Sequence, residues 1–170
     1  LIDWSYDILT EGERVLFRRL SVFAGGWTFE AAEAICSDLD VLDLLTQLIN
    51  KSLVTVEEGG GDARYRLLET IRQYARDKLL EAGEAEQTRN LHLEYFVRFG
   101  EETSPYLDTA EVLNWIPRID AEYDNLRTAF EWSLDHDVEA SLRIVGNLAY
   151  YWFRRGHGAE GMELSKAAFA

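Results

Sequence analysis

Cysteine, proline and methionine are scarce in this sequence, which has one, two and one of them among 170 residues. The lone Cys36 excludes an intramolecular disulfide framework, and its apolar helical context indicates a buried thiol in a reducing compartment, so we expect the cytoplasm. Pro105 and Pro117 lie near expected helix boundaries, where proline is best tolerated. Because Met162 is the only methionine, we expect the chain to be a piece of a larger protein.

The sequence also lacks long apolar runs and has few basic residues. No stretch approaches the roughly 18 consecutive apolar residues of a membrane span, and the start does not resemble a signal peptide, so we expect no membrane partner. Lys and Arg number 17 against 31 acids, a net charge of −14 that is spread over both halves. Because duplex binding depends on neutralising phosphates, this charge argues against nucleic acid. The hydrophobic content of 47% is enough for a folded core.

The first half has the pattern of three helices followed by a hairpin. Thr10 caps a predicted helix over 13–24, Thr28 caps a second over 29–36, and Asp38 or Asp40 caps a third that begins at Val41. Alternating segments at 52–58 and 63–68 flank the turn-forming GGGD of 59–62, and a helix over 69–82 follows, closed by Gly83. This order predicts a winged-helix domain over residues 1–87.

Residues 88–170 have helical periodicity throughout. The pattern predicts helices at about 85–103, 109–116, 119–135, 138–155 and 158–169, with short connections. Such spacing favours an α-solenoid of stacked helix pairs, and residues 148–170 resemble one tetratricopeptide unit with small residues at Ala149, Gly156, Gly161 and Ala168. The predicted fold class is therefore mainly α, a winged helix followed by tetratricopeptide-like helices.

The third predicted helix offers little positive charge to DNA. A helix that recognises the major groove needs side chains such as Arg, Lys, Asn or Gln directed at base edges and phosphates. Lys51, at its end, is the only base, and the polar positions expected on its surface are Asp40, Asp43, Thr46, Gln47 and Asn50. We therefore expect no direct contact with nucleic acid, although a DNA-binding winged helix remains the alternative.

Three segments together resemble a known family. They are LIDWSYDILTEGERVLFRRLSVFAGGWTFEAAEAIC, LLTQLINKSLV and RYRLLETIRQYA. The combination is similar to the winged-helix module of bacterial STAND regulators, NB-ARC-type signal-transduction ATPases that include LuxR-type and AfsR-type transcriptional regulators. The helices after it, including EYDNLRTAFEW, resemble the start of that family's sensor repeats.

The resemblance implies a non-catalytic regulatory role. In this family the module packs on an NB-ARC domain that binds ADP or ATP, so the partner is that domain within the same polypeptide and the cofactor lies outside this fragment. The triplet at the strand-to-helix junction would form the nucleotide-domain contact, and it is Leu67, Leu68 and Glu69 here. Leu68 replaces a histidine and cannot donate a hydrogen bond to phosphate, and Glu69 is expected to orient the helix start. An unidentified inducer or protein would bind the repeats.

The sequence gives no support for a nucleotide-binding loop, a metal site or catalysis in this fragment. No G-x-x-x-x-G-K-[ST] loop is present, and His92, His136 and His157 lack a second ligand at metal spacing. No nucleophile–base set occurs in a recognisable context, so we expect no catalysis, no metal and no cofactor in this fragment.

Aromatic and basic residues concentrate in the predicted helix over 138–155. Four consecutive aromatics are more than one buried stripe needs, and two arginines follow them. We expect a ligand or partner surface that includes Tyr150, Tyr151, Trp152, Arg154 and Arg155, with core packing as the alternative for each ring. A stand-alone tetratricopeptide adaptor is the third hypothesis for the whole chain.

Overall fold

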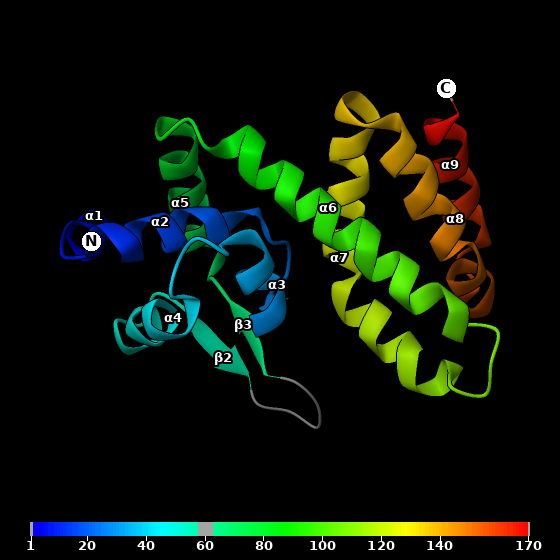
Figure 1. The fold of residues 1–170 in the computed structure, drawn as a ribbon, viewed down its shortest axis with the longest axis horizontal. Coiled ribbons are helices and arrows are strands. Elements are labelled where there is room, and N and C mark those ends of the chain that lie inside the picture. The colour runs from blue at the N-terminus through cyan, green and yellow to red at the C-terminus, as the bar shows by residue number, and fades with distance from the viewer. Residues whose placement is uncertain (1, 58–62, 170) are drawn as a thin grey trace. The chain divides into compact units, whose positions relative to one another are not determined.

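The computed structural model describes residues 2–57 and 63–169, and the chain forms two compact units, Leu1–His92 and Leu93–Ala170. Both the boundary between these units and the predicted domain boundary at 87/88 fall within one continuous helix, α6 (Ala85–Thr103) (Figure 1). The first unit contains α1 (Ile2–Asp7), α2 (Glu11–Arg19), a short 3₁₀ turn (Leu20–Val22), β1 (Trp27–Thr28), α3 (Phe29–Ile35), α4 (Val41–Asn50), β2 (Thr55–Glu57), β3 (Arg64–Arg66) and α5 (Glu69–Glu81).

The helix starts of the first unit follow from their capping residues. Thr10 and Glu13 form a reciprocal capping box at α2, in which the Thr10 amide donates to the Glu13 carboxylate over 2.6 Å. Thr28 caps α3 and Asp40 caps α4, each by accepting a hydrogen bond from the amide three residues ahead. The three predicted helices of the winged helix are therefore confirmed, and Asp40 is the residue that caps the third.

The hairpin belongs to a three-stranded antiparallel sheet in the order β1-β3-β2. Tyr65 lies opposite both Trp27 and Val56, whereas Arg64 lies opposite Thr28 and Glu57. The prediction of a two-stranded sheet is therefore incomplete, because β1 has only two residues and forms only by pairing with β3. The predicted GGGD turn at 59–62 lies outside the described residues.

The core of the first unit is built from α2, the segment after it, α3 and α4. Trp27 is stacked 5.4 Å from Phe23 and 6.5 Å from Tyr65, measured between ring centroids. The side chains at its centre are no more than 2% exposed and include Leu16, Leu20, Ile35, Leu45 and Leu48. This burial explains why the apolar stripes of these helices predict the fold well.

The second unit consists of helices that pack on their neighbours along the chain. After a 3₁₀ turn at Ser104–Tyr106 come α7 (Val112–His136), α8 (Val138–Arg155) and α9 (Gly158–Ala168), and α8 packs on both α7 and α9 (Figure 1). None of the described helices combines the length and apolarity that a membrane span requires.

Residues 109–135 do not form two helices divided at Pro117, so that prediction is wrong. Pro117 is the sixth residue of the 25-residue helix α7. Its missing N–H removes one hydrogen bond, to the carbonyl of Leu113 in the first turn. Both residues lie on the exposed side of α7, where water can hydrate that carbonyl, so the helix continues through the proline.

Close packing between α8 and α9 depends on Gly161. A Cβ atom at this position would lie 2.7 Å from the Trp152 ring, which is only 3% exposed. Gly156 ends α8 with a left-handed backbone, at φ 75°. Ala149, by contrast, is exposed, so it does not contribute to this close approach.

Replacement of Gly161 by alanine should therefore destabilise the second unit. We expect Gly161→Ala to lower the free energy of unfolding by about 1 to 2 kcal/mol, because the added methyl overpacks a rigid aromatic contact. Gly146→Ala on α8 is the matched control, since a Cβ there meets nothing within 4 Å and alanine favours helix. Urea denaturation checks both variants, and equal stability of Gly161→Ala and wild type would contradict the packing described here.

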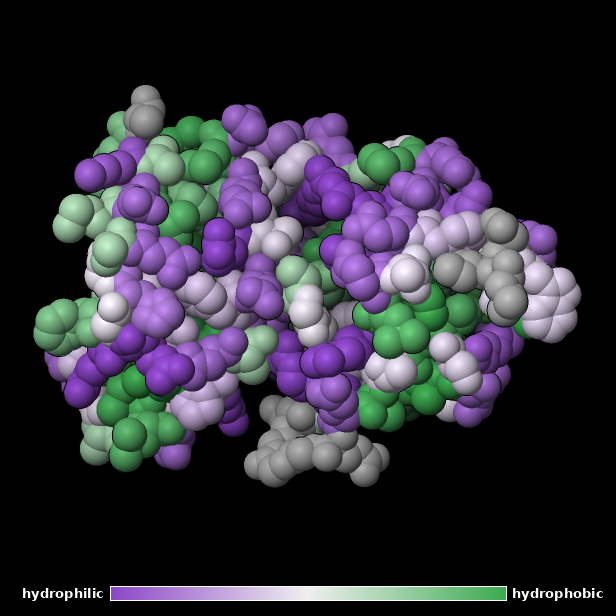
Figure 2. All heavy atoms as spheres, turned by 180° about the vertical axis from the view of Figure 1, so that it is seen from behind, coloured by the Kyte–Doolittle hydropathy of each residue, from purple (hydrophilic) through white to green (hydrophobic). Residues whose placement is uncertain are grey.

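Exposed apolar side chains are distributed over the surface. Figure 2 shows that hydrophobic groups reach one face of the molecule at several separate places among hydrophilic ones. Large apolar side chains that are more than half exposed include Trp4, Leu42, Leu113, Phe153 and Phe169. Scattered exposure of this kind is usual for proteins and marks no binding site by itself.

Candidate nucleic-acid interface

The third helix of the winged helix, α4, has one buried and one exposed side. Val41, Leu45 and Leu48 face the core, and Leu42, Asp43, Thr46 and Asn50 are exposed. The Thr46 hydroxyl donates to the Leu42 carbonyl over 2.7 Å, so its proton is already engaged. The exposed side thus combines an apolar, an acidic and an amide group and contains no base.

Lys51, which directly follows α4, is bound to an acid of the same domain. Its ammonium lies 2.5 Å from the Glu13 carboxylate, which is 3% exposed and also completes the α2 capping box. The pKa of Glu13 is lowered, because hydrogen bonds from Lys51 and Thr10 outweigh the opposing effect of burial. Lys51 therefore neutralises the buried Glu13 carboxylate, and its positive charge is not available to a ligand.

The sheet places two arginines on one face. Arg64 and Arg66 alternate with Tyr65, whose ring packs inward beside Trp27, so both arginines lie on the opposite face, together with Thr55 and Glu57. Arg66 is about half exposed and lies 3.2 Å from the Glu57 carboxylate. Exposed pairs of this kind contribute only about 0 to 1 kcal/mol, so a stronger anion can replace Glu57 at low cost.

The predicted nucleotide-domain contact occupies the junction between β3 and α5. Leu67 is buried, Leu68 is 55% exposed, and Glu69 is exposed. The N-cap residue of α5 is Leu68, whose side chain makes no capping bond, and the Glu69 carboxylate accepts hydrogen bonds from Arg72 and Gln73. These bonds lower the pKa of Glu69 to about 2. Glu69 thus orders the first turn of α5 through its side-chain contacts.

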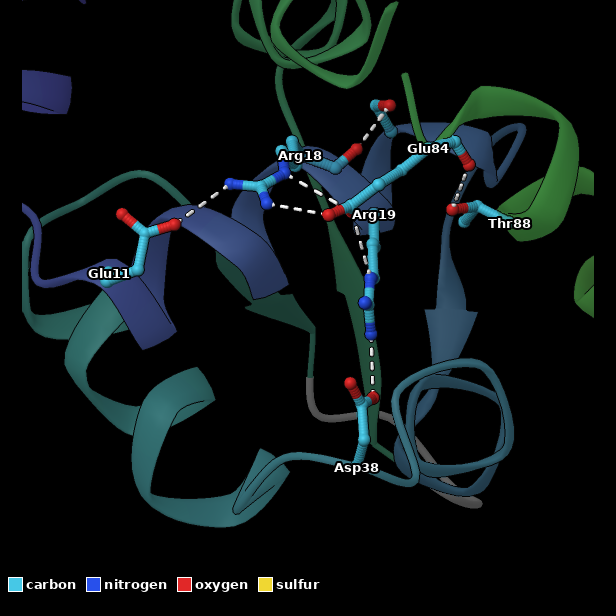
Figure 3. Close-up of polar contacts among 7 residues, drawn as sticks. Glu11, Arg18, Arg19, Asp38, Glu84 and Thr88 are labelled. Carbon is cyan, nitrogen blue, oxygen red and sulfur yellow. Dashed lines mark hydrogen bonds and ion pairs between the residues drawn. The ribbon is translucent and has the colours of Figure 1, made fainter. Parts of the chain in front are cut away.

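A charge cluster that sequence reasoning missed joins the end of α2 to the α5–α6 corner (Figure 3). The Glu84 carboxylate accepts hydrogen bonds from Arg18 at 2.7 Å and from Arg19 at 3.2 Å, and Arg19 also donates to Asp38 at 2.6 Å. Arg18 is bound further by Glu11 at 3.5 Å. The two arginines are only 11% and 16% exposed in their side chains, so Glu84 is the acid that makes their burial possible.

The cluster affects the protonation of the groups around it. Hydrogen bonds from Arg18 and then Arg19 lower the pKa of Glu84 in spite of partial burial, and the Arg19 bond lowers the pKa of Asp38. Burial raises the pKa of the neighbouring Cys36 thiol to about 12, which keeps it protonated and unreactive at neutral pH. The prediction that Cys36 is a buried small side chain is confirmed.

The predicted aromatic surface of α8 separates into a buried and an exposed part. Tyr151 and Trp152 are each 3% exposed; the Tyr151 hydroxyl donates to Asp120 over 2.7 Å, and the Trp152 indole donates to Tyr123 over 2.8 Å. Both rings therefore join α8 to α7 in the core. The pKa of Tyr123 is raised to about 12, mainly by burial.

The remaining residues of that predicted surface lie outside the core. Tyr150 is half-buried, and the exposed Arg154 guanidinium lies 5.3 Å from the centre of its ring. Arg155 forms an ion pair with Asp120 at 3.0 Å. Only Tyr150, Arg154 and Arg155 are therefore placed to meet a partner. Among the residues that the structure describes, no three His, Cys, Asp or Glu side chains gather as a metal site.

Most of the first unit matches a known protein-family model. Residues 9–80 match the family model described as "Winged helix-turn-helix domain", and this range runs from the residue before Thr10 into α5. The N-terminal region is a winged helix-turn-helix domain. Its three helices α2, α3 and α4, followed by β2 and β3, are the elements to which that description applies. No solved structure matches the chain.

Named relatives extend over both units. The chain is 41% identical over 167 residues to a Mycobacterium tuberculosis H37Rv protein named "Putative HTH-type transcriptional regulator Rv0890c" and to a Mycobacterium bovis protein of the same description. The match covers 95% of this chain and 19% of each relative, so the chain spans about a fifth of their length. An M. tuberculosis protein named "Uncharacterized protein Rv0894" is 43% identical over 91 residues, which are 50% of this chain and 23% of that protein.

These findings overturn one prediction about partners. The chain was expected to make no direct contact with nucleic acid, but residues 9–80 match a winged helix-turn-helix domain and the relatives are named as HTH-type transcriptional regulators, which conflicts with that expectation. The error has a physical source, because net charge is an average over the chain, whereas DNA meets only the local surface of one domain. The prediction of a winged helix in the first half of the chain is confirmed.

Proposed function

We propose that this chain is the DNA-binding winged-helix part, with adjoining helices, of a longer transcriptional regulator. The observation that carries the proposal is the winged helix-turn-helix domain itself, present in a chain that resembles relatives named as transcriptional regulators. In helix-turn-helix domains the second helix of the motif enters the major groove while other elements contact the backbone. The corresponding elements here are α4 and the β2–β3 face with Arg64 and Arg66.

The charge distribution predicts weak binding with few phosphate contacts. Because Lys51 is bound to Glu13, we assign the phosphate contacts to Arg64 and Arg66, which lie on one face of the sheet. The net charge of −14 adds long-range repulsion, so binding should require low ionic strength.

Removal of both sheet arginines should abolish duplex binding. We expect the double variant Arg64→Ala, Arg66→Ala to lose measurable affinity at low salt, because each arginine neutralises one phosphate. Fluorescence anisotropy of the 170-residue chain with a labelled duplex measures the effect, and circular dichroism verifies the fold.

The control removes the same charge from the second unit. Arg98 and Arg118 are exposed on α6 and α7, so Arg98→Ala, Arg118→Ala changes the net charge equally and should retain most of the affinity. If both double variants weaken binding to the same extent, net charge rather than the sheet face carries the interaction, and the assignment of this face fails.

A second candidate function is the regulatory coupling that the family resemblance implies. The observation in its favour is the surface of α4, which carries Leu42 and Asp43 but no base and so suits a protein contact as well as DNA. In this proposal the winged helix packs on a nucleotide-binding domain of the longer protein, which holds ADP or ATP, and the helices of the second unit begin a tetratricopeptide-like sensor array that binds an inducer through α8. The consecutive packing of α7, α8 and α9 supports the repeat assignment.

Substitution of the exposed Leu68 in the full-length regulator tests this coupling. A glutamate there should leave the winged helix folded, because the side chain is 55% exposed, but should weaken an apolar contact with the nucleotide domain and speed ADP release. Unchanged ADP release by Leu68→Glu, together with retained DNA binding, would leave only the first proposal.

A further inference from the structure

Three polar side chains on α4 lack any partner within the part of the chain that the structure describes. Asp43, Gln47 and Asn50 form no hydrogen bond or ion pair through their side chains there, whereas Lys51 and Arg66 are engaged by acids. Their spacing of i, i+4 and i+7 places them along one side of the helix. We name Asp43, Gln47 and Asn50 the α4 polar stripe.

The stripe has the dimensions of a short base-recognition surface. Seven residues of helix rise by about 10 Å, and stacked base pairs repeat about every 3.4 Å, so the stripe extends over about three base pairs. Asp43 and Asn50 are exposed and Gln47 is half-buried, so all three can reach a groove that admits α4.

The chemistry of the stripe selects among the bases. An Asn or Gln amide can donate to adenine N7 and accept from its N6 amino group, and a carboxylate can accept from the cytosine N4 amino group. Guanine offers two acceptors, N7 and O6, on the same edge, which a carboxylate repels and which Arg or Lys usually binds. Neither Arg nor Lys is present in the stripe.

We infer that, if the winged helix binds DNA as proposed above, the α4 polar stripe determines its sequence preference and recognises adenine and cytosine rather than guanine. Gln47 and Asn50 pair with adenines through their amides, and Asp43 accepts a hydrogen bond from a cytosine amino group while it excludes guanine. The sheet arginines Arg64 and Arg66 supply phosphate affinity but no sequence information.

The test begins with a search for a preferred DNA site. The 170-residue chain is used at low salt to select duplexes from a pool that has a random central segment. We expect Asn50→Ala to weaken binding to the selected duplex roughly tenfold and to leave binding to an unrelated duplex unchanged. Gln87→Ala, which removes an exposed amide from α6, should change neither affinity. Asp43→Asn should relax the exclusion of guanine in the selected sites, because an amide can donate to guanine acceptors, whereas Asp77→Asn on α5 should leave the base preference unchanged.

Base analogues distinguish adenine from guanine recognition directly. Replacement of adenines in the selected site by 7-deazaadenine removes the N7 acceptor and should cause a loss similar to that of Asn50→Ala, and 7-deazaguanine should cause none. An equal loss with 7-deazaguanine overturns the inference. The inference is also overturned if Asn50→Ala and Gln47→Ala bind the selected duplex as tightly as wild type. If binding is still lost in the double variant Arg64→Ala, Arg66→Ala, the proposed DNA binding stands, and α4 then faces a protein. If no duplex binds even at low salt, the proposed function fails as well.

Discussion

Leu45→Ala should lower the free energy of unfolding by about 2 to 5 kcal/mol. Leu45 lies on the inner side of α4, is 2% exposed, and belongs to the helix that packs on α2. Its truncation removes apolar burial and leaves a cavity between two helices whose ends are fixed by capping bonds, so the site can relax only partly. Urea denaturation followed by far-UV circular dichroism measures the change.

Leu42→Ala is the matched control on the same helix. Leu42 precedes Asp43 and is 65% exposed, so the same substitution should cost no more than a few tenths of a kcal/mol. Similar losses in both variants would show that the inner and outer sides of α4 are wrongly assigned.

Glu84→Gln should destabilise the first unit by about 2 to 3 kcal/mol. The neutral amide removes the negative charge that Arg18 and Arg19 share at the α5–α6 corner, and Glu11 then remains beside Arg18 and Asp38 beside Arg19. Removal of one partner from a buried ion pair costs more than the pair itself contributes. We place the cost below that of a fully buried pair, because the Glu84 side chain is 24% exposed. Thermal and urea denaturation measure it.

The pH dependence of this variant follows from the lowered pKa of Glu84. A carboxyl whose folded-state pKa lies below its unfolded value stabilises the protein above the unfolded pKa of about 4.3, and this contribution is lost as the pH falls through the folded pKa. Wild type should therefore be more stable than Glu84→Gln at pH 6 to 7, and the difference should shrink as the pH falls below about 4.

Glu81→Gln is the control for this cluster. Its carboxylate is 63% exposed and pairs with Lys78 three residues before it, so its replacement should have little effect at any pH. A constant difference between wild type and Glu84→Gln from pH 7 to pH 3 would mean that the lost contribution is not that of the ionised carboxylate.

Local signals allowed the first unit to be predicted in detail. Thr10, Thr28 and Asp40 are capping residues followed at once by an apolar stripe, and Gly83 has the positive φ of 70° expected after a helix end. These features depend on neighbours within about four residues, which the sequence shows directly.

Features that depend on distant residues could not be predicted in this way. Glu84 meets Arg18 and Arg19 across more than 60 positions, and no periodicity links them. Strand β1 forms only because Trp27 and Thr28 lie beside Tyr65 and Arg64 in the folded sheet. The packing of Tyr151 and Trp152 likewise depends on Asp120 and Tyr123 of another helix.

The DNA prediction failed for a related reason. The composition and the residues of α4 both show few bases, and neither shows that Arg64 and Arg66 share one face of a sheet in a winged helix-turn-helix domain. Sequence alternation contained the signal, because two arginines that flank an inward tyrosine must lie on the same side of the strand.

The salt dependence of duplex binding by the intact 170-residue chain tests the central claim most directly. If Arg64 and Arg66 contact phosphates, the logarithm of the binding constant should fall linearly with the logarithm of the salt concentration, with a slope of about −2. Replacement of both arginines by alanine should leave no measurable binding over the same salt range. Absence of binding to any duplex at low salt, from a chain shown to be folded by circular dichroism, would contradict the account.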